Sequence, residues 1–147
     1  MRTVPASPSH IVPLLAALST DDRALLDRLA GNSAALLLRH IGDSDPTWCG
    51  LDDAGGVVTM GGVIPKGDGE GYIWQLATPA IASHKRDYIL QSRMMMAKGL
   101  PLYRRLTTTI RADFTAALRH MRRMGFTIQP PADVAGLPAC RCERMLP

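Results

Sequence analysis

The sequence lacks the cysteine pattern of a disulfide-stabilised or zinc-binding protein. Its three cysteines are odd in number and include no Cys-x-x-Cys pair, whereas small secreted scaffolds carry even numbers and zinc sites use closely spaced pairs. Cys140-x-Cys142 on a strand would place both thiols on one face, where half-buried, small apolar side chains are the usual interpretation. We therefore expect an intracellular protein with neither a disulfide nor a metal site.

Long hydrophobic runs are also missing. The longest apolar stretches, Ile11 to Leu18 and Ala34 to Leu38, are far shorter than the roughly 20 residues that cross a bilayer. Prolines 5, 8 and 13 stand where a signal peptide would need a continuous apolar segment. These absences predict a soluble protein, and the length of 147 residues predicts one domain spanning residues 1–147.

Acidic residues are scarce in the middle of the chain. Residues 1–83 carry five basic and nine acidic groups, whereas residues 84–123 carry ten basic and two acidic groups. The middle segment is therefore about eight charges positive, which indicates an anionic partner such as nucleotide phosphates, DNA or an acidic protein surface. The alternative is that Lys and Arg side chains simply solvate two helices.

Known catalytic motifs are absent as well. The sequence contains no nucleophile elbow, no Walker loop and no cluster of metal ligands. The four histidines, at positions 10, 40, 84 and 120, are scattered along the chain, and His84 and His120 fit helix surfaces better than a catalytic site. We assign no catalytic residue and no metal ligand from these patterns.

The N-terminal part of the chain follows helical spacing. A short edge strand is predicted at residues 2–6, where Pro5 is tolerated. Three helices should follow, because N-cap residues precede leucine stripes and glycines end them; they begin near Ser7, Thr20 and Asn32, and the last two end at Gly31 and Gly42.

The rest of the chain alternates between strand and helix patterns. A hairpin is predicted at residues 48–51 and 57–64, a connection at 65–71 and a third strand at 72–77. A helix from about Ala80 to Lys98 and a β-branched strand at 106–110 come next. Asp113 should begin the last helix and Gly125 should end it; strands at 126–128 and 140–145 should flank a loop at 130–138.

This order of elements resembles the GNAT acyltransferase fold. The resemblance is strongest in the last helix, Phe114-Thr-Ala-Ala-Leu-Arg-His-Met-Arg-Arg-Met-Gly-Phe126. It implies an α+β protein with a GNAT-like mixed, mainly antiparallel sheet of six to seven strands and helices on both faces.

Two cofactor motifs of active members of that fold are altered. Their Arg/Gln-x-x-Gly-x-Gly/Ala loop corresponds to residues 78–86 here, which contain no glycine. If CoA binds, the resemblance places it at Leu76, Thr78, Lys85 and Arg86, where the two basic side chains attract the phosphates by charge. In active members, the last helix carries an Asn that holds the cofactor and a Tyr that acts as general acid to the departing thiolate. Here Phe114 stands at the Asn position and Met121 at the Tyr position.

A general acid that could replace this Tyr is difficult to find in the sequence. Tyr88 and Tyr103 are candidates, although tyrosines on an apolar face more often belong to the core. No carboxylate lies on the predicted strand 72–77, so a general base also lacks a candidate.

A second resemblance is to a divergent GNAT-like internal virion protein family of short-tailed bacteriophages, which also lacks the glycine loop. It rests on Trp74-Gln75-Leu76, on the basic helix that follows and on Thr107-Thr-Thr-Ile110. It implies a role in the virion or its assembly, through contacts with portal, internal or tail proteins, and a location in the virion or in the host cytoplasm.

The basic helices suggest an interaction surface. Met94-Met95-Met96 cannot all face one side of a helix, so Met94 is expected to point outward as an adaptable contact. The predicted interaction surface consists of Lys85, Arg86, Arg93, Met94, Arg119, Arg122 and Arg123. It could dock an acidic protein ring or DNA.

Our leading interpretation is a non-catalytic, GNAT-like phage protein that acts through protein contacts, without a cofactor. The alternative is an acetyl-CoA-dependent N-acyltransferase with a degenerate pyrophosphate loop. A third interpretation is direct DNA binding by the basic helices, although base-reading motifs are lacking.

Overall fold

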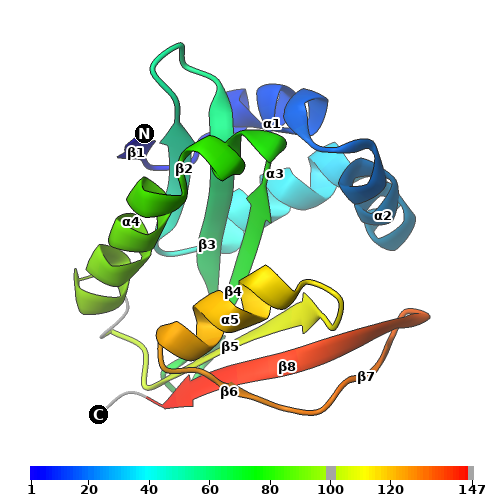
Figure 1. Ribbon diagram of the computed structural model, residues 1–147, viewed down its shortest axis with the longest axis vertical. Coiled ribbons are helices and arrows are strands. Elements are labelled where there is room, and N and C mark those ends of the chain that lie inside the picture. Colours follow the sequence, from blue (N-terminus) through cyan, green and yellow to red (C-terminus); the bar gives the residue numbers. More distant parts are fainter. Residues whose placement is uncertain (99–101, 146–147) are drawn as a thin grey trace. The chain divides into compact units, whose positions relative to one another are not determined.

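The computed structural model describes residues 1–98 and 102–145, which form an α+β fold (Figure 1). The strands are β1 (Arg2–Val4), β2 (Thr47–Leu51), β3 (Val57–Gly67), β4 (Glu70–Ala77), β5 (Arg105–Arg111), β6 (Thr127–Ile128), β7 (Ala132–Val134) and β8 (Leu137–Met145). The α-helices are α1 (Ile11–Ala17), α2 (Thr20–Ala30), α3 (Ser33–Asp43), α4 (Lys85–Lys98) and α5 (Thr115–Arg123), with 3₁₀ turns η1 (Pro8–His10) and η2 (Pro79–Ser83).

The strands form one mixed sheet. Its order is β1-β2-β3-β4-β5-β8-β6, and β7 pairs with β8. Strands β4 and β5 run parallel, whereas β1 with β2, β2 with β3, and β8 with β5, β6 and β7 are antiparallel. The predicted fold class is therefore confirmed, and in the described part of the chain the sheet contains eight strands where six or seven were expected.

The chain divides into two compact units. Unit 1 comprises Met1–Ile64 and Trp74–Gln91, and unit 2 comprises Pro65–Ile73 and Ser92–Pro147. Both β4 and α4 contribute residues to each unit. The prediction of one domain stays a prediction, and the units are described separately below.

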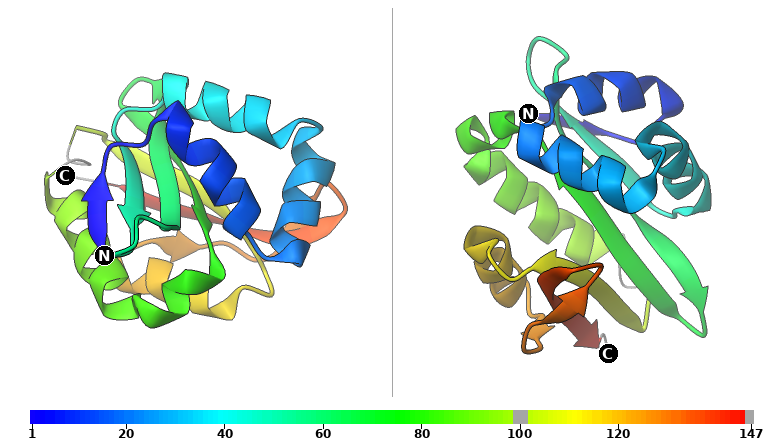
Figure 2. Two further views of the ribbon diagram at one scale, coloured as in Figure 1. Left: turned by 90° about the horizontal axis from the view of Figure 1, so that it is seen from above. Right: turned by 90° about the vertical axis from the view of Figure 1, so that its right-hand side faces the viewer.

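Unit 1 has its core between the strands and two N-terminal helices. Leu14 of α1 and Leu37 of α3 are buried with Met60 of β3, because the leucine stripes of the helices face the apolar side of the sheet. The first half of α4 lies on the opposite face of these strands (Figure 2). The expected helices on both faces are thus present in this unit.

A tryptophan joins β4 to α3 within unit 1. The indole Nε1 of Trp74 donates a hydrogen bond to Ser44 Oγ at 2.8 Å, and that hydroxyl donates to the carbonyl oxygen of His40 at 2.5 Å. The His40 ring meets the Trp74 ring edge-on, with 5.2 Å between centroids. Because a buried indole N–H requires an acceptor, this chain of bonds fixes Trp74 against the end of α3.

Unit 2 is built on the pairing of β5 with β8, whose register runs from Arg105 opposite Met145 to Arg111 opposite Ala139. The Arg105 guanidinium contacts Glu70 Oε1 of β4 at 3.0 Å and also Glu143 of β8. The hydrogen bond from Arg105 lowers the pKa of the Glu143 carboxyl. One arginine therefore links three neighbouring strands.

Helix α5 covers one face of the unit 2 strands (Figure 1). It ends at Gly125, as predicted: Gly125 has φ +88°, and Phe126 N–H donates to the Met121 carbonyl oxygen at 3.0 Å. This left-handed C-terminal turn is the conformation that favours glycine. The helix does not begin at Asp113, because that carboxylate forms an ion pair with Arg111 and Phe114 occupies the N-cap.

Other predicted boundaries also differ from the structure. The predicted helix at residues 80–98 begins only at Lys85, because residues 79–83 form η2. The predicted connection at residues 65–71 is mostly strand, since only Asp68 (φ 55°) and Gly69 (φ 76°) turn, as in a two-residue hairpin. The predicted loop at residues 130–138 contains β7, which pairs with β8.

None of the helices within residues 1–98 and 102–145 has the length and apolar character needed to cross a bilayer.

Candidate functional site

The carboxyl end of β4 in unit 1 is held by a buried threonine. Thr78 is 2% exposed, and its hydroxyl donates to the carbonyl oxygens of Val57 at 2.8 Å and Val58 at 3.2 Å. The carbonyl oxygen of Leu76 accepts from Thr59 Oγ1 at 3.0 Å. The Thr78 side chain is therefore committed to β3, and Thr78 and Leu76 serve to fix the strand end that precedes α4.

The turn η2 replaces the glycine loop of active GNAT enzymes. Residues 79–83 form a 3₁₀ turn in which Ile81 N–H donates to Thr78 O and His84 N–H donates to Ile81 O, both at 3.0 Å. No residue between 78 and 86 has a positive φ. Because two backbone N–H groups are consumed within the turn, this segment does not offer the ring of N–H donors that a glycine loop presents to phosphates.

The first turn of α4 supplies hydrogen-bond donors in place of the glycine loop. Lys85 and Arg86 are exposed there, and the N–H groups of a first helical turn have no acceptor within the helix. Asp87 Oδ2 is occupied by the ammonium of Met1 at 3.0 Å. Among the residues that the structure describes, no carboxylate forms an ion pair with Lys85 or Arg86. Two unpaired cations at a helix N-terminus favour an anion at this position.

The two candidate general acids, Tyr88 and Tyr103, differ in exposure. Tyr103 is 8% exposed and belongs to the core of unit 2, whereas Tyr88 on α4 in unit 1 is only partly buried. Met121 on α5 is partly buried and Phe114 is exposed at its N-cap, under the guanidinium of Arg111 at 4.6 Å from the ring centroid. Of the two tyrosines, Tyr88 is the less buried.

The cysteines are unsuited to nucleophilic catalysis. All three thiols are free and buried. Burial raises the pKa of Cys49 to about 11 and also raises the pKa of Cys142. Because the thiolate is the nucleophile, a thiol with such a pKa is almost entirely unreactive at neutral pH. In the described part of the chain, no three His, Cys, Asp or Glu side chains are grouped so that they could hold a metal ion.

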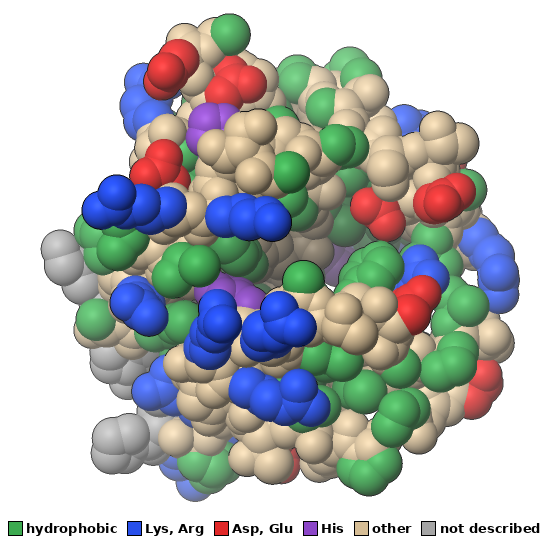
Figure 3. Space-filling view, viewed as in Figure 1, with side chains coloured by type: hydrophobic (Ala, Val, Ile, Leu, Met, Phe, Trp, Pro, Cys, Tyr) green, Lys and Arg blue, Asp and Glu red, His purple; other side chains and the backbone are tan. Residues whose placement is uncertain are grey.

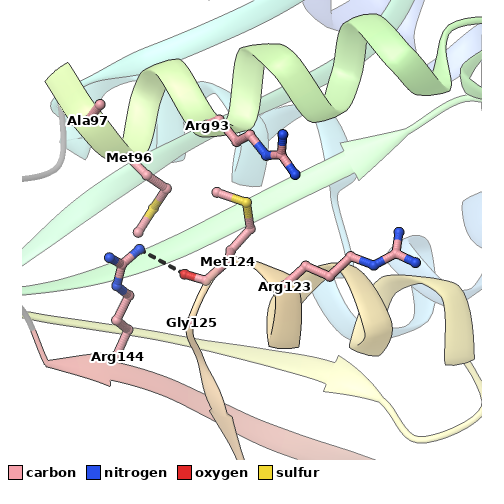
Figure 4. A pocket seen from close by; sticks show the side chains of 7 residues that line it. All are labelled: Arg93, Met96, Ala97, Arg123, Met124, Gly125 and Arg144. Carbon is pink, nitrogen blue, oxygen red and sulfur yellow. Dashed lines mark hydrogen bonds between the residues drawn. The ribbon is translucent and has the colours of Figure 1, made fainter.

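Unit 2 contains an open, basic pocket of about 380 Å³ (Figure 4). Arginines from three elements reach it: Arg93 from α4, Arg123 from α5 and Arg144 from β8. The rest of the lining is Met96, Ala97, Met124 and Gly125. Arg144 Nη1 donates to the carbonyl oxygen of Met124 at 2.7 Å, which satisfies one of the terminal carbonyls of α5. The lining therefore combines cations with apolar side chains.

His120 lies beside this pocket. Its Nε2 is 3.2 Å from Ser92 Oγ. Burial lowers the pKa of the His120 imidazole, and the positive charges of Arg123 and Arg93 lower it further. The neutral imidazole is therefore favoured, because burial disfavours the charged form and a positive charge there would be repelled by both guanidinium groups.

The structure brings together part of the predicted interaction surface. Arg93 and Arg123 line one pocket, and Arg119 and Arg122 are exposed on the same helix as Arg123. Met94 is 51% exposed, as expected for an outward-facing methionine. In unit 2, Lys and Arg side chains gather over α5 on the face shown in Figure 3. The sequence singled out these residues by charge but did not predict Arg144, because its contact with Met124 depends on the pairing of β6 with β8.

Solved acetyltransferase structures match this chain over nearly its whole length. A ribosomal-protein-alanine N-acetyltransferase from Brucella melitensis is 16% identical, with a TM-score of 0.72 over 99% of this chain and 100% of that chain. A GNAT superfamily phosphinothricin acetyltransferase from Sinorhizobium meliloti, in complex with AcCoA, is 15% identical, with a TM-score of 0.72 over 99% and 88%. An acetyltransferase of the GNAT family from Streptococcus pneumoniae is 12% identical, with a TM-score of 0.64 over 99% of each chain. No protein-family model and no curated protein matches the sequence.

These likenesses contradict the leading interpretation from the sequence. A non-catalytic phage virion component was expected, but the solved structures of this fold described above are named as acetyltransferases. The resemblance to a phage virion family finds no support in them. The predicted partners, other virion proteins or DNA, are not tested and stay predictions. What the likenesses establish, at these identities, is that this chain has the GNAT fold.

Proposed function

We propose that this protein is an acetyl-CoA-dependent N-acyltransferase. The observation that carries the proposal is the likeness, over 99% of the chain, to an acetyltransferase solved in complex with AcCoA. One further likeness supports an amine as the acceptor, because the matching protein is named as a ribosomal-protein-alanine N-acetyltransferase.

The N-terminal turn of α4 is the element that would hold the diphosphate of the cofactor. Lys85 and Arg86 contribute two charges there, and the N–H groups of the first turn contribute hydrogen-bond donors. This arrangement uses side-chain charge where active relatives use a glycine cradle. The fit is therefore looser, because lysine and arginine side chains must be ordered when the phosphates bind.

The reaction would proceed by direct transfer. A neutral amine attacks the thioester carbonyl carbon, the carbon–sulfur bond breaks, the departing thiolate takes up a proton and the new amide nitrogen loses one. No acyl-enzyme on cysteine is formed, because the three thiols are buried and the pKa of Cys49 is raised to about 11. Tyr88 is the candidate donor of the proton to the thiolate, since it is the less buried of the two candidate tyrosines.

The expected location in the virion or the host cytoplasm stays a prediction. The acetyl-transfer proposal requires only a compartment that supplies acetyl-CoA, so it does not depend on either location.

Acetyl transfer can be tested by following the release of free CoA thiol. The protein would be mixed with acetyl-CoA and a panel of primary amines that includes amino acids, alanine-terminated peptides and lysine-containing peptides. Amine-dependent thiol release together with an acetylated product in the mass spectrum is expected. If neither appears with any amine, although acetyl-CoA binds, the chain binds the cofactor without catalysing transfer and the proposal is wrong.

Neutralising the two basic residues at the start of α4 should weaken cofactor binding. A hydrogen bond to a charged group contributes about 1.5 to 3 kcal/mol, so we expect Lys85→Gln with Arg86→Gln to raise the Kd for acetyl-CoA by at least about tenfold. Isothermal titration calorimetry measures the change. Arg39→Gln, at an exposed arginine on α3 in the same unit, is the matched control and should leave the Kd unchanged. Equal Kd values in the double variant and the wild type would place the diphosphate elsewhere.

A further inference from the structure

The basic pocket of unit 2 has no role in the acetyl transfer proposed above. Its lining comes from the second half of α4, the end of α5 with the turn after it, and β8. The residues assigned to acetyl-CoA, Lys85 and Arg86, lie in unit 1 and do not line it. The pocket volume of about 380 Å³ falls within the range of small-molecule sites.

Positive charge in unit 2 is not balanced locally. Unit 2 contains eleven Lys and Arg against five Asp and Glu, which gives it a net charge of +6. Three of those acids are already engaged, because Glu70 and Glu143 pair with Arg105 and Asp113 pairs with Arg111. No acidic residue lines the pocket.

The three pocket arginines are not equivalent. Arg144 is committed to the carbonyl of Met124. Within residues 1–98 and 102–145, Arg93 and Arg123 form neither an ion pair nor a hydrogen bond with a side chain or carbonyl. Figure 4 shows both of their side chains extending the same way from α4 and α5. Both residues line the same pocket, and both charges also act on the imidazole of His120.

We propose that Arg93 and Arg123 bind the phosphate group of a small organic phosphate in this pocket. Two guanidinium groups on different elements can each donate two hydrogen bonds to a tetrahedral dianion, which a single arginine cannot saturate. Met96, Ala97 and Met124 would contact the apolar part of the ligand, because methionine side chains adapt to irregular shapes.

The C-terminus of α5 repels a phosphate in this pocket only weakly. The carbonyls at a helix C-terminus carry about half a negative charge, and Arg144 already satisfies one of them. The charges of Arg93 and Arg123 exceed that contribution. The competing explanation is that all three arginines only solvate and stabilise helix ends, in which case no anion would bind with a measurable Kd.

Two probes test the proposal on the full chain at constant ionic strength: inorganic phosphate and phenyl phosphate, with chloride as the reference salt. Isothermal titration calorimetry should give saturable binding of both, and phenyl phosphate should bind more tightly because its ring reaches the apolar lining. Arg93→Gln and Arg123→Gln should each raise the Kd at least fivefold. Arg119→Gln, at an exposed arginine of α5 that does not line the pocket, should change it less than twofold.

A second readout is the titration of His120, followed by NMR. The hydroxyl of Ser92 lies 3.2 Å from its Nε2, and the charges of Arg93 and Arg123 act on the imidazole. Bound phosphate neutralises those guanidinium groups, so the pKa of His120 should rise towards its ordinary value when phosphate is added. The signals of the other histidines serve as internal references.

Several outcomes would overturn the proposal. An equal loss of affinity in Arg119→Gln would indicate diffuse attraction to the surface of α5. A loss in Lys85→Gln with Arg86→Gln, but not in the pocket variants, would place the phosphate at the start of α4. A DNA duplex that binds more tightly than phenyl phosphate and is weakened by all arginine substitutions would indicate a nucleic-acid surface. Circular dichroism of each variant shows whether its fold is retained, and all substituted side chains are exposed.

Discussion

Replacing Leu106 by alanine is expected to lower the free energy of unfolding by about 2 to 5 kcal/mol. Leu106 is 0% exposed in β5, where it lies opposite Gly71 of β4 and Arg144 of β8. The substitution removes three buried carbon atoms and leaves a cavity that the flanking strands cannot fill without losing their register. Denaturation in urea, monitored by circular dichroism, measures the effect.

Leu102→Ala is the matched control for Leu106→Ala. It is the same substitution in the same unit, at a side chain that is 79% exposed. A change within about 0.5 kcal/mol is expected there. If both variants lost equally little stability, β5 would not form the buried centre of unit 2, and the pairing of β4 with β5 would have to be revised.

Replacing Gly61 by valine is expected to cost about 3 kcal/mol of stability. A Cβ at position 61 would lie 2.6 Å from the carbonyl oxygen of Trp74 and 2.7 Å from Cε2 and Cζ2 of Trp48. The nearest of these atoms belongs to the backbone of β4, which cannot move away without breaking its pairing. The two methyl groups of valine enlarge the clash. Thermal unfolding measures the loss as a lower midpoint.

Gly42→Ala, in the same unit as Gly61→Val, is expected to raise stability instead of lowering it. Gly42 lies in the last turn of α3, and no atom would be within 4 Å of an added Cβ. Alanine there should raise stability by about 0.5 to 1 kcal/mol, because it restricts the unfolded chain and favours the helix. A stable Gly61→Val protein would show that β3 and β4 are not as close at Gly61 as the structure has them.

Most helices and strands were predictable because their signals are local. The cap at Asn32, the leucine stripe of α3 and the terminating Gly125 act within one or two helical turns. The second predicted cap was one residue late, because Ser19 caps α2 and Thr20 is its first helical residue. The unpredicted strand β7 depends on pairing with β8, which is a contact between distant segments. Its residues, Ala132, Asp133 and Val134, have no alternating pattern and follow two prolines.

The late start of α4 illustrates a tertiary influence on a helix boundary. Pro79 and the residues after it are compatible with an α-helix, so sequence reasoning began the helix at Ala80. In the structure, the Thr78 hydroxyl binds two carbonyls of β3, and the chain then makes a 3₁₀ turn before Lys85. The residues that open α4 are therefore Lys85 and Arg86, which places both charges at its N-terminus.

The candidate site was predictable in its residues but not in its arrangement. Charge counting identified Lys85, Arg86, Arg93 and Arg123 without indicating that the first pair and the second pair belong to different units. The function was misjudged because the missing glycines and the replaced Tyr and Asn were taken as evidence against catalysis. Under the proposed function, other donors would hold the cofactor in place of the glycines and the Asn, and another group would protonate the thiolate in place of the Tyr.

The most direct test of the acyltransferase account is the thermal unfolding of the wild-type protein with and without millimolar acetyl-CoA. A ligand present at about a hundredfold its Kd adds roughly 2.7 kcal/mol to the stability of the folded state, which moves the midpoint by several degrees. The account predicts such an upward shift, and a smaller one for Lys85→Gln with Arg86→Gln. An unchanged midpoint of the wild-type protein at saturating acetyl-CoA would contradict it.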